Sequence, residues 1–72
     1  MKTNPIHIKQ IEFVGNTMII HGISKRVTLS LEKLSIKLCK ANSNERNTYQ
    51  ISPSGLGVHW PLIDEDLSFT NL

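Results

Sequence analysis

The sequence predicts a small α+β domain, an antiparallel β-sheet of β-β-β-α-β-β order with one helix packed on it. Three observations support this class. Apolar residues alternate with polar ones in two blocks, residues 6–31 and 49–60, which is the period of a strand with one buried face. Between the blocks, apolar residues recur every three to four positions, as in a helix. Short turn signals separate the first strands, so these are expected to pair antiparallel.

The first block divides into three strands. The first covers residues 6–13, and its alternation slips at residues 9–10, which predicts a β-bulge. The Gly-Asn pair at residues 15–16 predicts a tight hairpin turn, because glycine adopts positive φ freely. A second strand over residues 18–21 is apolar enough to be central. A third, residues 26–31, has the alternation of a half-buried strand.

A helix is expected from Ser30 or Leu31 to about Lys40, because the apolar period changes there and Ser30 suits an N-cap. Its leucines fall on the side that would lie on the sheet, and Ile36 falls outside that side. The basic side chains on the opposite side are Lys33, Lys37 and Lys40.

The second block holds two short strands, at residues 49–52 and 56–60. Before it, Asn42 and Glu45 have the spacing of a capping box, which predicts one further helical turn. Pro61 cannot donate to a sheet and is expected to end the last strand. The tail after Pro61 is irregular in pattern but apolar, so we expect it to pack on the sheet or on another chain.

The 72 residues predict one small domain over the whole chain, 1–72. A single core of this size supplies at most about 3–5 kcal/mol. Cys39 is the only cysteine, so an internal disulfide and a multi-cysteine zinc site are excluded. We therefore expect a homodimer to reinforce the fold. The sequence starts without a signal peptide and has no apolar run of the roughly 20 residues that span a bilayer, which predicts a cytoplasmic protein and no membrane contact.

Charge is unevenly distributed, although the net charge is only +2. Residues 1–46 contain all eight Lys and Arg against three Glu, giving +5. Residues 47–72 contain three acids and no Lys or Arg, giving −3. One interpretation is that both faces are simply solvated. The other is an acidic end that recognises a basic partner or its own neighbour.

The most specific segments are Gly-Leu-Gly-Val-His-Trp-Pro at residues 55–61 and Ile-Asp-Glu-Asp-Leu-Ser at 63–68. Together with residues 26–31, the helix leucines and Arg46, they resemble a small bacterial family catalogued as domain of unknown function 2442. Residues 21–24, His-Gly-Ile-Ser, depart from the Asp-Gly and basic residue common in that family.

The resemblance implies a small sheet with a packed helix. It also implies a non-enzymatic accessory protein, often encoded beside another small protein in a toxin–antitoxin-like pair and sometimes on a mobile element. The family has no established catalytic residues, so none is assigned here.

We therefore predict a protein-interaction module that is not an enzyme. Apolar anchors would combine with an acidic run that complements a basic partner. Trp60 is expected in the core or at an interface, and His59 on the surface, bonded to a carboxylate such as Asp64. The predicted partner-binding residues are His59, Trp60, Asp64, Glu65, Asp66 and Phe69.

Two alternatives remain open. One is a nucleic-acid-binding accessory that uses a basic face; its residues are Lys25, Arg26, Lys33, Lys37 and Lys40. The other is a small-molecule binder around His59. No metal or cofactor is expected, because the acidic run lacks the spacing of a calcium loop and the three histidines are scattered.

Overall fold

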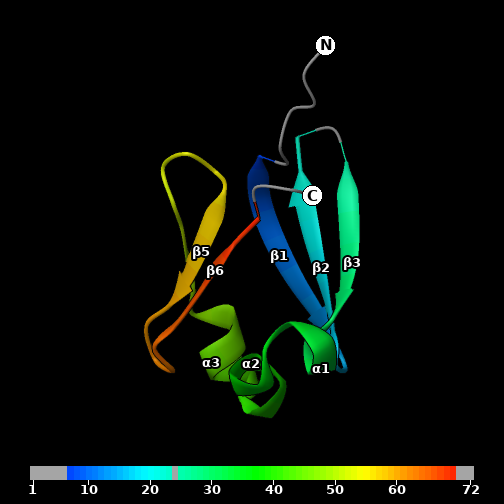
Figure 1. Cartoon of the computed structure of the whole chain (residues 1–72), viewed down its shortest axis with the longest axis vertical. Coiled ribbons are helices and arrows are strands. Elements are labelled where there is room, and N and C mark those ends of the chain that lie inside the picture. Colours follow the sequence, from blue (N-terminus) through cyan, green and yellow to red (C-terminus); the bar gives the residue numbers. More distant parts are fainter. Residues whose placement is uncertain (1–6, 24, 70–72) are drawn as a thin grey trace.

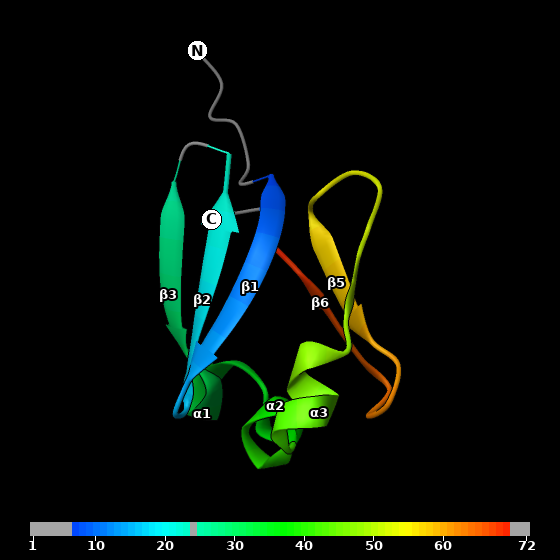
Figure 2. The same ribbon diagram turned by 180° about the vertical axis from the view of Figure 1, so that it is seen from behind.

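The computed structural model describes residues 7–23 and 25–69 and confirms the α+β class. It contains two antiparallel three-stranded sheets, of strand order β1-β2-β3 and β4-β5-β6. Figure 1 shows the sheets side by side, with the helices gathered at one end of both, and Figure 2 shows the same arrangement from behind.

The first sheet follows the predicted meander. Its strands are β1 (Ile8–Val14), β2 (Thr17–Gly22) and β3 (Arg26–Ser30). The expected bulge is confirmed, since the register of β1 on β2 shifts between Ile8 and Gln10. The hairpin turn is confirmed as well, with Gly15 at φ 58°. β2 is the central strand, and its Met18 and Ile20 are fully buried.

The helical region differs in detail from the expected single helix. It consists of α1 (Leu31–Leu34), α2 (Ile36–Lys40) and α3 (Ser43–Asn47). Ser35 separates the first two because its backbone is extended, with φ −159° and ψ 113°. Its hydroxyl accepts a hydrogen bond from the Leu38 N–H at 3.2 Å and so begins a new helix. No described helix is long and apolar enough to cross a membrane.

Ser30 occupies the N-cap position of α1 but makes no side-chain cap bond. The capping box of α3 is confirmed. The Asn42 side chain accepts from the Glu45 N–H at 2.8 Å, and the Glu45 side chain accepts from the Asn42 N–H at 2.9 Å. Two backbone donors at the start of α3 are thus satisfied within the segment itself.

The second sheet contains one strand more than expected. Its strands are β4 (Gln50–Ile51), β5 (Gly57–Trp60) and β6 (Glu65–Ser68). β5 ends immediately before Pro61, as predicted. β6 lies in the tail that was expected to be irregular, and it pairs with β5 from Gly57↔Ser68 to Trp60↔Glu65. This pairing, rather than local propensity, makes the acidic segment a strand.

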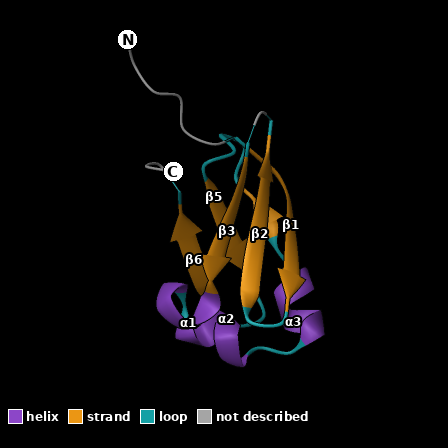
Figure 3. Cartoon of the chain, turned by 90° about the vertical axis from the view of Figure 1, so that its right-hand side faces the viewer, coloured by secondary structure: helices purple, strands orange, loops and turns teal. Residues whose placement is uncertain are grey.

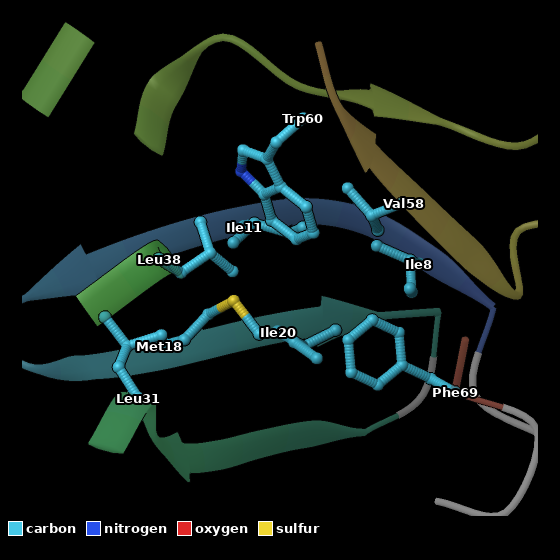
Figure 4. Close-up of a cluster of buried hydrophobic side chains, with 9 residues drawn as sticks. All are labelled: Ile8, Ile11, Met18, Ile20, Leu31, Leu38, Val58, Trp60 and Phe69. Atoms are coloured by element: carbon cyan, nitrogen blue, oxygen red, sulfur yellow. The ribbon is translucent and has the colours of Figure 1, made fainter. Parts of the chain in front are cut away.

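The strands form two sheets and not the single sheet expected from the sequence. The core lies between these two sheets. Both sheets have an apolar face, and each buries that face against the other and against the helices. Figure 4 shows Trp60 and Val58 of β5 above Ile11 and Ile8 of β1. The buried apolar side chains of the described residues are Ile8, Ile11, Met18, Ile20, Leu31, Leu38, Val58, Trp60 and Phe69. Figure 3 shows the helices below the ends of the strands.

Arg46 of α3 ties the helices to the first hairpin. Its guanidinium donates to the carbonyls of Leu38 (3.0 Å), Cys39 (2.9 Å) and Gly15 (2.7 Å). The first two carbonyls lie in the last turn of α2, where few helical donors remain; that of Leu38 also accepts from the Ala41 N–H at 3.2 Å. The same guanidinium stands 5.7 Å from the centre of the Phe13 ring, a cation–π distance.

Candidate functional site

The turn between β5 and β6 presents the acidic segment at the surface. Leu62 is 52% exposed, and the side chains of Asp64 and Asp66 are also exposed. Asp64 has φ 51°, a left-handed conformation that aspartate tolerates better than most residues. The chain reverses here and enters β6 at Glu65.

Helix α2 holds this turn in place. The buried hydroxyl of Ser35 donates to Glu65 Oε2 at 2.5 Å, and Lys37 Nζ donates to the carbonyl of Asp64 at 3.0 Å. The other carboxylate oxygen of Glu65 accepts from the Asp66 N–H at 3.3 Å. Glu65 is therefore occupied by contacts within the chain, whereas the Asp64 side chain is exposed, and that of Asp66 is exposed but bonded to His59.

His59 lies on the outer face of the second sheet, as predicted. Its Nδ1 is 2.6 Å from Asp66 Oδ1, because Asp66 is its direct cross-strand partner. The expected Asp64 contact is thus replaced by Asp66. On the outer face of the first sheet, His21 and Glu12 form a similar pair.

Two of the residues predicted to contact a partner belong to the core instead. Trp60 is 0% exposed and Phe69 is 4% exposed. Trp60 also donates from Nε1 to the carbonyl of Arg46 at 3.0 Å, so its polar atom is satisfied internally. Of the two readings of Trp60, core or interface, the structure places it in the core. Neither side chain is available for direct contact.

Exposed apolar side chains that the sequence analysis did not assign to the site lie beside the acidic turn. Ile36 is 57% exposed and follows Ser35, which bonds Glu65. Leu62 belongs to the turn itself. The segments that carry these two residues are joined by the Ser35–Glu65 and Lys37–Asp64 bonds. We call Ile36, Leu62, Asp64 and Asp66 the turn surface.

The basic residues of the alternative site are separated from one another. Lys33 lies on α1, whereas Lys37 and Lys40 lie on α2 beyond the break at Ser35. Lys37 is also engaged with the Asp64 carbonyl. Lys25 and Arg26 lie at the start of β3, at the far end of the strand from the helices (Figure 1). The basic stripe expected on one helix, Lys33, Lys37 and Lys40, is thus divided between α1 and α2, and Lys25 and Arg26 lie apart from it.

A hollow of about 420 Å³ lies over the second sheet, next to His59. Its polar lining includes Gln50, Ser52, His59, Asp66 and Ser68. The hollow is open to solvent, whereas small-molecule sites usually enclose most of the ligand surface. Within residues 7–23 and 25–69, no three His, Cys, Asp or Glu side chains are grouped closely enough to hold a metal ion.

Loss of the Ser35 hydroxyl is expected to destabilise the domain. We predict that Ser35→Ala lowers the free energy of unfolding by about 1–3 kcal/mol, because it removes the cap of α2 and a donor to Glu65. Urea denaturation followed by circular dichroism would measure this. Ser30→Ala is the matched control, since Ser30 makes no cap bond. Equal midpoints for both variants would contradict the role of Ser35.

Comparison with known proteins finds one matching family model, described as "Protein of unknown function (DUF2442)", over residues 8–72. The match includes all six strands and all three helices. No curated protein and no solved structure shows significant similarity to the chain.

Proposed function

Since the chain belongs to the DUF2442 family, whose function is unknown, we propose a function from its surface: a protein-interaction module that is not an enzyme. It acts as a homodimeric, antitoxin-like accessory in the cytoplasm and binds a small basic protein encoded beside it. The observation that carries this proposal is the turn surface: two large apolar side chains are more than half exposed and two carboxylates are exposed, on segments that Ser35–Glu65 and Lys37–Asp64 hold together.

The composition of the turn surface supports binding to a protein. Apolar side chains that are surrounded by polar groups characterise protein interfaces. Ile36 and Leu62 provide the apolar contact, and Asp64 and Asp66 provide charges that favour a basic partner. Complementary charge of this kind raises the association rate and excludes acidic competitors more than it raises affinity.

The surface is also fixed before a partner arrives. α2 and the β5–β6 turn are joined through Ser35–Glu65 and Lys37–Asp64, and His59 restrains Asp66 from the neighbouring strand. A partner that binds a fixed surface does not have to order it, which reduces the entropic cost of association. In this proposal Trp60 supports the site from below, by anchoring the end of β5 in the core.

We predict that the double variant Asp64→Asn and Asp66→Asn binds the adjacent gene product about tenfold more weakly, a loss of about 1.4 kcal/mol. The physical reason is the loss of two charges that attract a basic surface. Calorimetric titration of the purified neighbour into each variant measures the change. The difference in affinity between the double variant and the wild type should be smaller at high salt, since exposed charges are screened.

The matched control is Glu12→Gln, which removes an exposed carboxylate paired with a histidine on the other sheet. It should bind the neighbour as the wild type does. A second variant, Ile36→Ser with Leu62→Ser, should also weaken binding while leaving the buried core intact. Unchanged affinity in both turn-surface variants, with folding retained, would contradict the proposed surface.

A further inference from the structure

We propose that the free edge of β3 pairs with β3 of a second copy, in an antiparallel arrangement centred on Thr28. The resulting dimer would extend β1-β2-β3 into one six-stranded sheet. This inference rests on the homodimer in the proposed function, and it involves a surface distinct from the turn surface.

The hydrogen bonds at the two ends of β3 define which of its backbone groups point outward. The Gly22 N–H donates to the Lys25 carbonyl at 2.8 Å, and the Leu31 N–H donates to the Asn16 carbonyl at 2.8 Å. Residues in an antiparallel pair point alternately toward and away from the partner strand. The odd-numbered residues from 25 to 31 therefore direct their backbone groups to β2, and the N–H and C=O groups of Arg26 and Thr28 and the N–H of Ser30 point to the open edge. The Ser30 carbonyl belongs to the N-cap of α1 and accepts its first helical bond.

β3 also lacks the features by which proteins usually protect an edge strand. Its pairing with β2 runs from His21↔Arg26 to Thr17↔Ser30 without a register shift. Its sequence, Arg-Val-Thr-Leu-Ser, has no proline and only one charge, which lies at its first position. Within the described residues β3 is bonded to β2 alone.

The other edges are closed or unsuitable. On β1, the Ile8 N–H donates to the Gly55 carbonyl at 2.8 Å, and the Ile11 N–H donates to the Tyr49 hydroxyl at 3.1 Å. On β6, the Asp66 N–H is bonded to the side chain of Glu65, and two of four residues are acidic. β4 has two residues. β3 is therefore the edge strand whose outward backbone groups can pair with another strand.

A second copy of β3 complements the first. With Thr28 on the twofold axis, Arg26 lies opposite Ser30 of the other copy, so like charges do not meet. The three facing pairs of outward residues would exchange about four backbone hydrogen bonds, two between the Thr28 residues and one from each Ser30 N–H to the Arg26 carbonyl of the other copy. Thr28 would lie opposite its own equivalent, and threonine pairs across antiparallel strands are favourable.

Apolar side chains add to this pairing. Val27 and Leu29 lie on the inner face of β3 and are half-buried, packed at the margin of the core. In the dimer Val27 would lie opposite Leu29 of the other copy, and each would cover apolar surface that is now exposed. Association would thus extend a core that is small for independent stability.

The test uses the self-pairing of Thr28. The wild type should have twice the chain mass of 8.1 kDa by size-exclusion chromatography with light scattering. Thr28→Lys and Thr28→Glu should each be monomeric, because each places like charges directly opposite one another at the axis. A mixture of the two variants should regain the dimer mass. This rescue is specific to a register in which residue 28 faces itself.

Gln10→Lys is the control. Gln10 is exposed on β1, where the edge is closed, so this variant should remain dimeric. Circular dichroism confirms that each variant is folded. A monomeric wild type, dimeric Thr28→Lys, or a mixture that stays monomeric would overturn the inference. Measuring partner binding with monomeric Thr28→Lys keeps the two proposals distinguishable, since loss of the dimer alone leaves the turn surface intact.

Discussion

Arg46→Met is expected to lower the free energy of unfolding by about 3 kcal/mol or more, which is most of the stability that a domain of this size has. A methionine fills a similar volume but donates no hydrogen bond. The carbonyls of Leu38, Cys39 and Gly15 would lose their charged donor. Hydrogen bonds to charged groups contribute about 1.5–3 kcal/mol each, although they are not additive.

The position of Arg46 explains why one side chain has so large an effect. α1, α2 and α3 have four or five residues each, too short to be stable alone. Arg46 donates to two carbonyls at the end of α2, of which that of Leu38 also accepts from the Ala41 N–H, and at the same time it binds the turn between β1 and β2. Its removal would therefore release the helices from the first sheet as well as leave acceptors unpaired.

Urea denaturation would measure the loss, with Arg46→Lys and Lys40→Met as comparisons. Lysine keeps the charge but lacks the planar fork that reaches several acceptors, so Arg46→Lys should be intermediate. Lys40 is an exposed basic residue on the neighbouring α2, and its replacement should change the free energy of unfolding by less than about 0.5 kcal/mol. Equal midpoints for Arg46→Met and Lys40→Met would show that these contacts contribute little.

Local sequence signals predicted the elements whose structure depends on nearby residues. The bulge of β1, the Gly15 turn, the capping box of α3 and the end of β5 before Pro61 are all confirmed. In each case the structure depends on the backbone properties of one or a few neighbouring residues, such as a glycine that adopts positive φ or a proline that has no N–H to donate. Such requirements can be read from a short window of sequence.

The break between α1 and α2 depends on a contact across 30 residues. Ser35 ends one helix and begins the next while its hydroxyl bonds Glu65. The sequence contained a signal of this break, because Ile36 falls outside the apolar stripe of a continuous helix. The break explains that position: Ile36 is the first residue of α2 and is exposed.

The side chains of the candidate site were only partly predictable from the sequence. The sequence identified the acidic segment and His59, and the structure places them together at the β5–β6 turn. The sequence placed Ile36 outside the buried side of the helix, exposed or at an interface, but it did not identify Leu62 as an exposed apolar residue, and it assigned the apolar contacts to Trp60 and Phe69. An apolar residue in a small domain can serve the core or an interface, and only the packing of β5 on β1 decides between them.

Substitutions of Trp60 should affect the free energy of unfolding but not the affinity for the partner. Trp60→Ala should lower the free energy of unfolding by about 3–5 kcal/mol and leave the domain largely unfolded. It removes the largest fully buried side chain of the described core. It also removes the Nε1 donor to the Arg46 carbonyl. An unfolded variant cannot test binding, so a milder change is needed.

Trp60→Phe retains an aromatic ring but loses the Nε1 bond and part of the ring volume, so we expect it to remain folded with a loss of about 1–2 kcal/mol. Because Trp60 is 0% exposed, this variant should bind the partner with unchanged affinity at temperatures where it is folded. Circular dichroism gives the stability and calorimetric titration the affinity. A folded Trp60→Phe with tenfold weaker binding would instead mean that β5 opens to present Trp60 to the partner.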